Sequence, residues 1–256
     1  MDWARTIHVK SPVEIAIMRE AGRINAETLA AVNELLQPGV TTADLNAAAE
    51  EVLRKYNAIS PFKGYPGPYP YPASITVSIN NELVHGIPGK RKLRAGDIVS
   101  VDCGTILDGF VADSAFTGGV GKISPQAGKL LEVTQGALYA GIDKLRSGNR
   151  TGDVSAAIQH FVESSGFHVT HEYTGHGVGR QMHEGPQVPN YGITGRGLLL
   201  RPGLTIALEP MVLIGTPATR LLADQWTVVS ADGSLTAHFE HTVAVTEGEP
   251  FILTVL

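Results

Sequence analysis

An internal repeat restricts the possible folds of this chain more than any other feature of its sequence. Segment 36–44 is similar to segment 145–153, with Leu, Gly, Thr and Asp at matching positions. Further along, 94–102 is similar to 201–209, and each of these two apolar segments ends on a carboxylate. Two matches in the same order indicate a duplication, for which chance similarity of amphipathic segments is the alternative.

The repeat predicts two related halves, about 11–121 and 122–247, within one domain that spans residues 1–256. Ser11-Pro12 and Ser124-Pro125 stand at equivalent places and each has the pattern of a helix start, a capping serine followed by proline at the first helical position. Each half combines helical segments with antiparallel hairpins. We therefore expect an α+β fold with internal pseudo-twofold symmetry, in which helices cover one side of antiparallel sheets.

A predicted hairpin brings two aspartates together. Asp108-Gly109 separates two apolar segments, and Asp-Gly between apolar segments is a strong signal for a two-residue hairpin turn. A turn at this position places Asp113 opposite Gly104. Because alternate residues of a strand share a face, Asp102 and Asp113 become diagonal neighbours on the same face.

Two glutamates of the second half extend this acidic group. By the repeat, Glu209 corresponds to Asp102, and Glu240, inside the predicted strand 235–245, takes the role of Asp113. Pseudo-twofold symmetry then brings the two carboxylate pairs face to face. Carboxylates that converge within apolar strands repel one another and are costly to desolvate unless a cation lies between them. The alternative is that they lie on a solvated face. Four such groups predict about two divalent cations.

Histidines beside glycine are candidates for the same site. His176, His183 and His85 stand in glycine-containing segments, where the backbone can approach other groups closely. His238 lies two residues before Glu240 and is expected on the same face of the strand. One histidine added to an oxygen-rich ligand set favours Mn, Fe or Co over a closed structural zinc site.

Composition excludes several classes of protein. Hydrophobic residues make up 43% of the chain, which is compatible with a packed core. The net charge of −5, without a block of like charges, gives no electrostatic signal for nucleic acid or membrane binding. Residues 1–5 lack the apolar segment of a secretory signal, and the single cysteine, Cys103, is consistent with a reducing compartment. We expect a cytoplasmic monomer.

Several motifs together resemble the type I methionine aminopeptidases of the pita-bread metallopeptidase superfamily. The resemblance runs from about Ser11 to Val245. The motifs that carry it are, in chain order, Phe62–Tyr65, Ser78–Gly89, Gly96–Asp102, Asp108–Asp113, Gly175–Arg180, Glu209-Pro210, Asp224–Thr227 and Glu240–Val243. It implies the pita-bread fold for the whole chain as a catalytic domain.

The resemblance also implies roles for particular residues. It implies two divalent cations, which would be Co, Mn or Fe(II). Asp102 would bind one cation with both oxygens, and His176 and Glu209 would bind the other. Asp113 and Glu240 would bridge the two. Glu209 is the candidate general base. The substrate would contact His85 and His183 at the scissile peptide, with its methionine side chain in a pocket formed by Phe62, Tyr65, Thr76, Met182 and Trp226.

The implied activity is removal of the initiator methionine from nascent polypeptides with a small second residue, and ribosome docking is left open. An Xaa-Pro peptidase of the same fold is one alternative, although such enzymes usually carry a further N-terminal domain for which 256 residues leave no room. A non-catalytic binding module is the other, but such relatives lose metal ligands. Thr76, Met182, His238 and the long loop 66–72 depart from the usual pattern and leave the shape of the pocket rim open.

Overall fold

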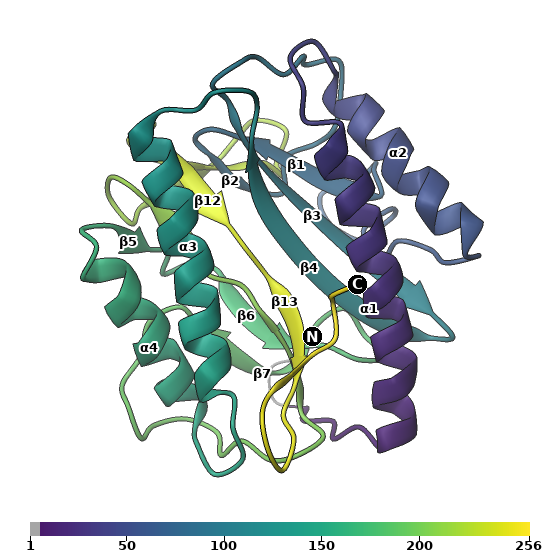
Figure 1. The fold of residues 1–256 in the computed structure, drawn as a ribbon, viewed down its shortest axis with the longest axis vertical. Coiled ribbons are helices and arrows are strands. Elements are labelled where there is room, and N and C mark those ends of the chain that lie inside the picture. The colour runs from purple at the N-terminus through teal and green to yellow at the C-terminus, as the bar shows by residue number, and fades with distance from the viewer. Residues whose placement is uncertain (1–5) are drawn as a thin grey trace.

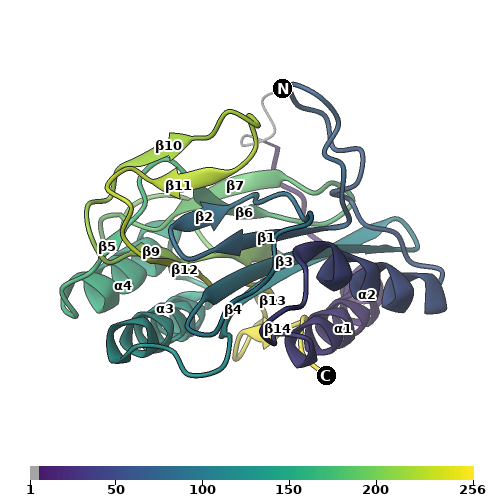
Figure 2. The same ribbon diagram turned by 90° about the horizontal axis from the view of Figure 1, so that it is seen from above.

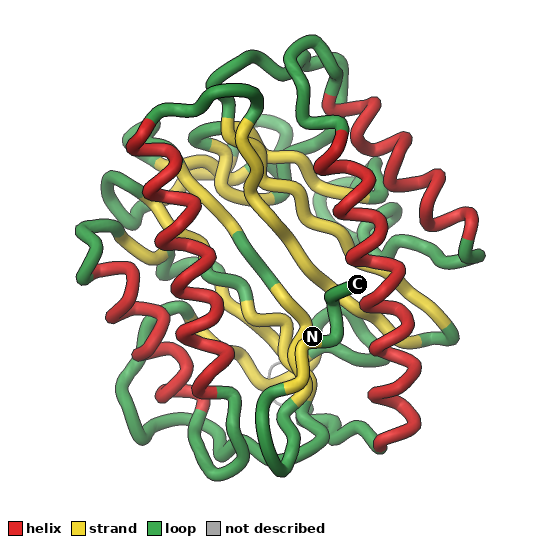
Figure 3. Tube along the Cα trace, viewed as in Figure 1, coloured by secondary structure: helices red, strands yellow, loops and turns green. Residues whose placement is uncertain are grey.

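The helices lie together on one side of the strands in the computed structural model, which describes residues 6–256 (Figures 1 and 2). α1 (Pro12–Glu34) and α2 (Thr42–Lys55) pack on the strands of the first half of the chain. α3 (Pro125–Lys144) and α4 (Thr151–Glu163) pack on those of the second. Figure 3 shows the same separation of helix and strand layers, as the α+β prediction requires. Residues 1–5, where the sequence predicts no secretory signal, lie outside the described part.

The helix starts follow the capping signals of the sequence. At α1, the Glu14 amide donates to Ser11 Oγ (3.3 Å) and the Ser11 amide donates to the Glu14 carboxylate (2.9 Å), which forms a capping box. At α3, the Ala127 amide donates to Ser124 Oγ (3.1 Å), with proline at the first helical position. Both predicted starts are confirmed.

The strands form several small antiparallel sheets. Their orders are β1-β3-β4, β10-β11-β2, β12-β9-β5 and β14-β13-β8-β6-β7. In chain order the strands are β1 (Ile75–Ile79), β2 (Glu82–Val84), β3 (Ile98–Leu107), β4 (Phe110–Gly119), β5 (His168–Val169), β6 (Thr174–Gly177), β7 (Glu184–Pro189), β8 (Thr205–Leu208), β9 (Met211–Leu213), β10 (Thr219–Leu221), β11 (Val228–Ser230), β12 (Thr236–His238), β13 (His241–Ala244) and β14 (Phe251–Ile252).

The β3–β4 hairpin has the predicted register. Asp108 and Gly109 form its turn with φ of 48° and 77°, the left-handed values that a type I′ turn requires at both central positions. Gly104 pairs with Asp113, as expected from a turn at this point. Asp102 pairs with Ala115, two residues further along β4, so Asp102 and Asp113 are diagonal neighbours.

The predicted continuous strand 235–245 is wrong in one respect. β12 ends at His238 and β13 begins at His241, so Phe239 and Glu240 lie between two strands. The interruption arises because β12 pairs with β9 while β13 pairs with β8 in another sheet. At the crossing point Glu240 forms an isolated bridge to Ala115 of β4, with its amide donating to the Ala115 carbonyl at 2.9 Å.

Two large apolar clusters stabilise the helix–strand contacts. One surrounds α3 and α4 and includes Leu130, Ile158 and Ile206, while the other lies under α1 and α2 and includes Leu45 and Val101, all of them fully buried. Burial of such side chains contributes roughly 1.5–3 kcal/mol each. Within residues 6–256, none of the helices has the length and apolar character needed to cross a bilayer.

Candidate metal centre

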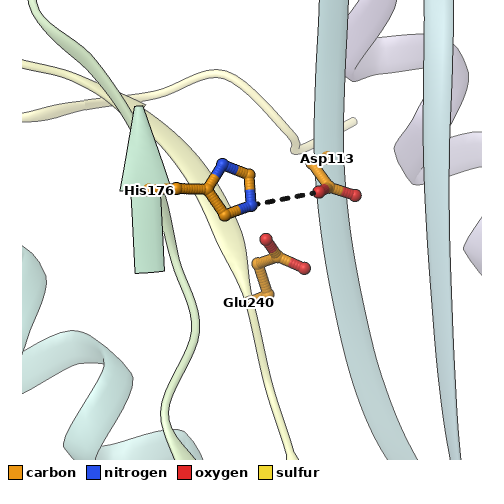
Figure 4. A group of neighbouring side chains, drawn as sticks. All are labelled: Asp113, His176 and Glu240. Carbon is orange, nitrogen blue, oxygen red and sulfur yellow. Dashed lines mark ion pairs between the residues drawn. The ribbon is translucent and has the colours of Figure 1, made fainter. Parts of the chain in front are cut away.

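The three residues in Figure 4 converge from three separate elements of the fold. Asp113 projects from β4, His176 from β6, and Glu240 from the crossing between β12 and β13. One ligand atom of each lies within 4.8 Å of those of the other two, and all three residues are buried. His176 Nε2 lies 3.9 Å from Asp113 Oδ2. The chain thus brings together, from distant segments, three groups able to bind one cation.

Two further carboxylates from the sequence prediction lie at the same place. Glu209 directly follows β8, and its Oε1 lies 3.5 Å from His176 Nε2. Asp102, on β3, faces the same cavity as Asp113 and Glu209. The structure therefore brings all five predicted metal ligands into one cavity, two from the first half of the chain and three from the second.

The carboxylates are held in a setting that disfavours negative charge. Burial raises the pKa of Asp102 to about 7. The pKa of Asp113 is raised well above its usual range by burial and by the neighbouring Glu240 and Asp102. Burial and nearby acids likewise raise the pKa values of Glu209 and Glu240. A group of buried acids with these pKa values requires either protons or cations to be stable.

Unpartnered oxygen atoms show that cations fit better than protons alone. Within residues 6–256, Asp102 Oδ1, Asp113 Oδ1 and Glu240 Oε1 are buried and have no hydrogen-bond partner. Buried polar atoms are nearly always satisfied by some partner. The carboxylates of Asp113 and Glu240, with the His176 imidazole within 4.8 Å of both, form a donor set that suits a divalent cation.

His176 has the orientation and protonation state of a metal ligand. Its Nδ1 lies 2.9 Å from the Gly177 carbonyl, which can only accept, so Nδ1 carries the proton. The lone pair is then on Nε2, the atom that faces the carboxylates. Burial lowers the pKa of His176 to about 3, which keeps the ring neutral at physiological pH. A backbone partner that fixes the tautomer in this way is typical of histidines that bind metals.

His238 shares this environment, as its position two residues before Glu240 predicts. Its Nε2 lies 3.6 Å from Glu209 Oε2 and 3.9 Å from Glu240 Oε2. His241, in contrast, has its Nδ1 2.8 Å from Thr254 Oγ1. His241 therefore contacts the C-terminal segment and does not line the cavity.

A cavity of about 160 Å³ opens beside the acidic group. Besides the five predicted ligands it is lined by all of the predicted substrate residues, namely Phe62, Tyr65, Thr76, His85, Met182, His183 and Trp226. Tyr71 also lines it, although the sequence does not predict this residue as part of the site. The only signal for Tyr71 was its place at the end of the aromatic loop that begins at Phe62.

The two predicted substrate histidines are held by defined contacts. His183 Nδ1 lies 2.8 Å from the Tyr65 hydroxyl, and its ring lies edge-on to His176 with the centroids 4.4 Å apart. His85 has a left-handed backbone with φ of 62°, a conformation that is uncommon outside glycine. Burial lowers the pKa values of His85 and His183 to about 4.

The long loop 66–72 forms an aromatic wall of the cavity. Tyr71 and Tyr69 contact the Trp226 ring edge-on, with centroid distances of 5.2 and 6.2 Å. The Tyr71 hydroxyl donates to the Gly86 carbonyl at 2.9 Å, which ties the loop to the segment after His85. This loop therefore helps to fix the shape of the cavity.

Comparison with known proteins identifies the family. The model of metallopeptidase family M24 matches residues 16–247. The chain belongs to family M24. Within this family it is 51% identical to a methionine aminopeptidase of Clostridium acetobutylicum over 97% of this chain and 98% of that protein. It is 50% identical to methionine aminopeptidase 1 of Bacillus subtilis over 96% of this chain and 98% of that one.

Solved structures of the M24 family confirm the predicted pita-bread fold. Methionine aminopeptidase from Thermotoga maritima is 44% identical to this chain and has a TM-score of 0.95, over 98% of this chain and 100% of that one. The Xaa-Pro dipeptidase from Bacillus anthracis is 21% identical and has a TM-score of 0.77, and this chain covers only 61% of its length. The fold is thus shared with the Xaa-Pro peptidases, whereas full-length similarity is to the methionine aminopeptidases.

Proposed function

We propose that this chain is a metalloaminopeptidase that removes the initiator methionine from nascent polypeptides, with preference for a small second residue. The observation that carries the proposal is the convergence of five ligand-type residues beside an apolar cavity of side-chain size. High identity to methionine aminopeptidases over the full length of the chain supports the same substrate.

Two divalent cations would be held by the five converging residues, Asp102, Asp113, His176, Glu209 and Glu240. When bound, such cations supply a water molecule acidic enough to act as the nucleophile near neutral pH. The fold holds these ligands in place independently of the cations. The β3–β4 register positions Asp102 and Asp113. The contact with the Gly177 carbonyl orients His176, and the bridge to Ala115 positions Glu240.

Glu209 is the residue that we propose accepts a proton from the attacking water. Its carboxylate lines the cavity that would hold the scissile peptide, and it is also one of the groups that would hold the cations, so it lies within reach of the water that they activate. After attack, the same carboxylic acid would return the proton to the leaving amine.

His183 and His85 are the residues that we propose contact the scissile peptide. The Tyr65 hydroxyl holds His183 through Nδ1, so Nε2 is the atom assigned to stabilise the negative charge that develops on the carbonyl oxygen. His85, whose ring lies edge-on to that of Tyr173, would contact the peptide group of the second residue.

The methionine side chain would enter the apolar part of the cavity. Aromatic and thioether contacts come from Phe62, Tyr65, Met182 and Trp226. Thr76 of β1 also lines the cavity and pairs with Asp102 of β3. An unbranched thioether fits such a wall well, because sulfur interacts favourably with aromatic rings. The free α-amino group of the substrate would lie near the acids, which restricts cleavage to the first residue.

Metal removal tests the proposal directly. We expect a chelator to abolish release of methionine from a Met-Ala-Ser peptide, and Mn, Fe(II) or Co(II) to restore it, with up to two ions per chain by elemental analysis. Asp113→Asn should lose both metal and activity, whereas Asp108→Asn, at the exposed hairpin turn, serves as the matched control. Full activity in rigorously metal-free protein would refute the mechanism.

Peptide specificity separates this function from the two alternatives. An Xaa-Pro peptidase would cleave a peptide with proline in second position in preference to Met-Ala-Ser, and a binding module would cleave neither. Since the cavity is built from residues of a single chain, both halves of which contribute ligands, we propose one catalytic domain that acts as a monomer in the cytoplasm. Analytical ultracentrifugation of the active, metal-loaded protein tests the oligomeric state.

A further inference from the structure

A buried ion pair lies directly behind the turn that carries His183. Lys10 Nζ lies 2.5 Å from Glu184 Oε2, and the two side chains are only 4% and 2% exposed. Lys10 Nζ also donates to the His8 carbonyl at 3.2 Å. Removing two charges from water is costly, and a hydrophobic pair of similar volume often stabilises a fold equally well. Stability alone therefore gives a weak reason for a charged pair at this position.

The second oxygen of Glu184 fixes the turn itself. Glu184 Oε1 accepts hydrogen bonds from the backbone amides of Arg180 (2.8 Å) and Gln181 (3.2 Å). One carboxylate thus binds both Lys10 and the start of the 180–184 turn. A charged acceptor makes hydrogen bonds about twice as strong as a neutral one, so the turn is held firmly at this point.

This turn connects two parts of the proposed active site. It joins β6 to β7, and Glu184 pairs with Gly177, the residue that follows His176. Met182 and His183 line the cavity, whereas Glu184 does not. Because Glu184 is the immediate neighbour of His183, a shift of its backbone moves the His183 ring directly.

The other end of the ion pair is fixed as well. The Lys10 amide donates to the Gly203 carbonyl at 2.7 Å, and the Gly185 amide donates to the Thr6 carbonyl at 3.0 Å. Ile7 forms a parallel bridge with Gly185. Segment 6–10 therefore lies along the start of β7 and supports the turn from the side away from the cavity.

We propose that Lys10 and Glu184 are positioning residues for catalysis. Their ion pair holds the 180–184 turn so that His183, and with it Met182, stands at the correct place in the cavity. The role assigned to His183 rests on the proposed function. The ion pair itself acts only through the turn and touches neither substrate nor metal ligands.

Substitutions that remove the pair should separate rate from stability. Lys10→Met and Glu184→Met should lower kcat for Met-Ala-Ser by about 10- to 10²-fold per folded, metal-loaded molecule, since a misplacement of about 1 Å has effects on this scale. KM and metal content should change little. Glu184→Gln, which keeps an acceptor for the two amides, should lose less. Lys129→Met, which removes an exposed lysine–glutamate pair on α3, is the matched control.

A further variant, Gly179→Ala, tests the proposal if Lys10→Met and Glu184→Met fail to fold. A Cβ added at Gly179 would overlap Lys10 Cε and lie 2.8 Å from Glu184 Oε1, so Gly179→Ala displaces the pair and keeps both charges. It should lower kcat in the same way. Unchanged kcat in Gly179→Ala, or in folded Lys10→Met with full metal content, overturns the proposal, as does a loss of rate that only follows a loss of metal.

A spectroscopic measurement makes the inference independent of the proposed function. The His183 Cε1–H resonance, assigned with His183→Gln, should shift or broaden in Glu184→Met and remain unchanged in Lys129→Met. An unmoved resonance in Glu184→Met refutes the positioning role. If the wild type releases no methionine, the proposed function fails while this measurement still decides the inference.

Discussion

Removing the metal should make the stability of this protein fall as the pH rises, because Asp102 is harder to ionise in the fold than in the unfolded chain. Burial raises its pKa to about 7 from an ordinary value of 3.8. A carboxyl group with a raised folded-state pKa stabilises the fold at low pH, and this contribution is lost as the pH rises through the folded pKa. The window of change therefore lies between about pH 4 and about pH 7.

The size of the effect follows from the difference between the two pKa values. One pKa unit corresponds to about 1.4 kcal/mol, so a shift of this size corresponds to on the order of 4 kcal/mol of unfolding free energy across this window, which Asp102 shares with the neighbouring Asp113. This is a large part of the roughly 5–15 kcal/mol that stabilises a typical domain. Bound cations favour the ionised carboxylate and should remove most of the pH dependence.

Urea unfolding of the chelator-treated protein at about pH 4.5 and about pH 7 measures this contribution. The informative quantity is the unfolding free energy of the wild type minus that of Asp102→Asn, because asparagine stays neutral at both pH values. We expect this difference to fall with pH by several kcal/mol. Asp108→Asn, at an exposed left-handed turn position that asparagine tolerates, should give a difference that does not follow this trend. A pH-independent difference for Asp102→Asn refutes the electrostatic account of the site.

Three further predictions concern the cavity and the packing around it. His85→Ala and His183→Ala should keep their metals and lose at least ~10²-fold in kcat, and loss of metal from either variant would make that histidine a ligand. Met182→Phe should raise the ratio of kcat/KM for methionine over norleucine, because a flexible thioether wall weakens the roughly 1–3 kcal/mol by which a pocket distinguishes similar side chains. An unchanged or lower ratio would mean that residue 182 does not bound the methionine side chain, or that loop 66–72 supplies that part of the wall. Gly104→Ala should destabilise the fold by about 1–3 kcal/mol in urea unfolding, because its Cβ would overlap a proline side chain. Gly128→Ala should stabilise the fold slightly, because it lies in open space on α3 and alanine favours a helix over glycine. Equal effects at these two glycines would contradict the packing argument.

The parts of this structure that short-range patterns determine could be predicted from the sequence. Asp108-Gly109 defines a turn, the turn defines the register, and the register makes Asp102 and Asp113 neighbours. The capping serines before α1 and α3 are equally local signals. The repeat extended this reasoning to Glu209 and Glu240. Their roles as ligands stay a prediction until metal is measured.

The parts that depend on long-range packing could not be predicted in this way. The sequence around Tyr71 has no pattern that predicts the hydrogen bond from its hydroxyl to Gly86, or that its ring lines the cavity. Lys10 and Glu184 are far apart in the chain, and neither stands in a pattern that indicates a partner. The break at Phe239 and Glu240 arises from pairing with two different sheets, whereas alternation of apolar residues predicts one continuous strand.

The bridge between Ala115 and Glu240 has a consequence for how activity arises during synthesis. It joins the middle of the chain to a segment close to its C-terminal end, so its formation requires closure of a very long loop. A ribosome makes the chain from the N-terminus at roughly 5–20 residues per second, and Glu240 is among the last of the proposed ligands to emerge. Until residue 240 has been made and has paired with β4, the protein has an incomplete ligand set, so translation of the first four ligands alone does not produce the proposed activity.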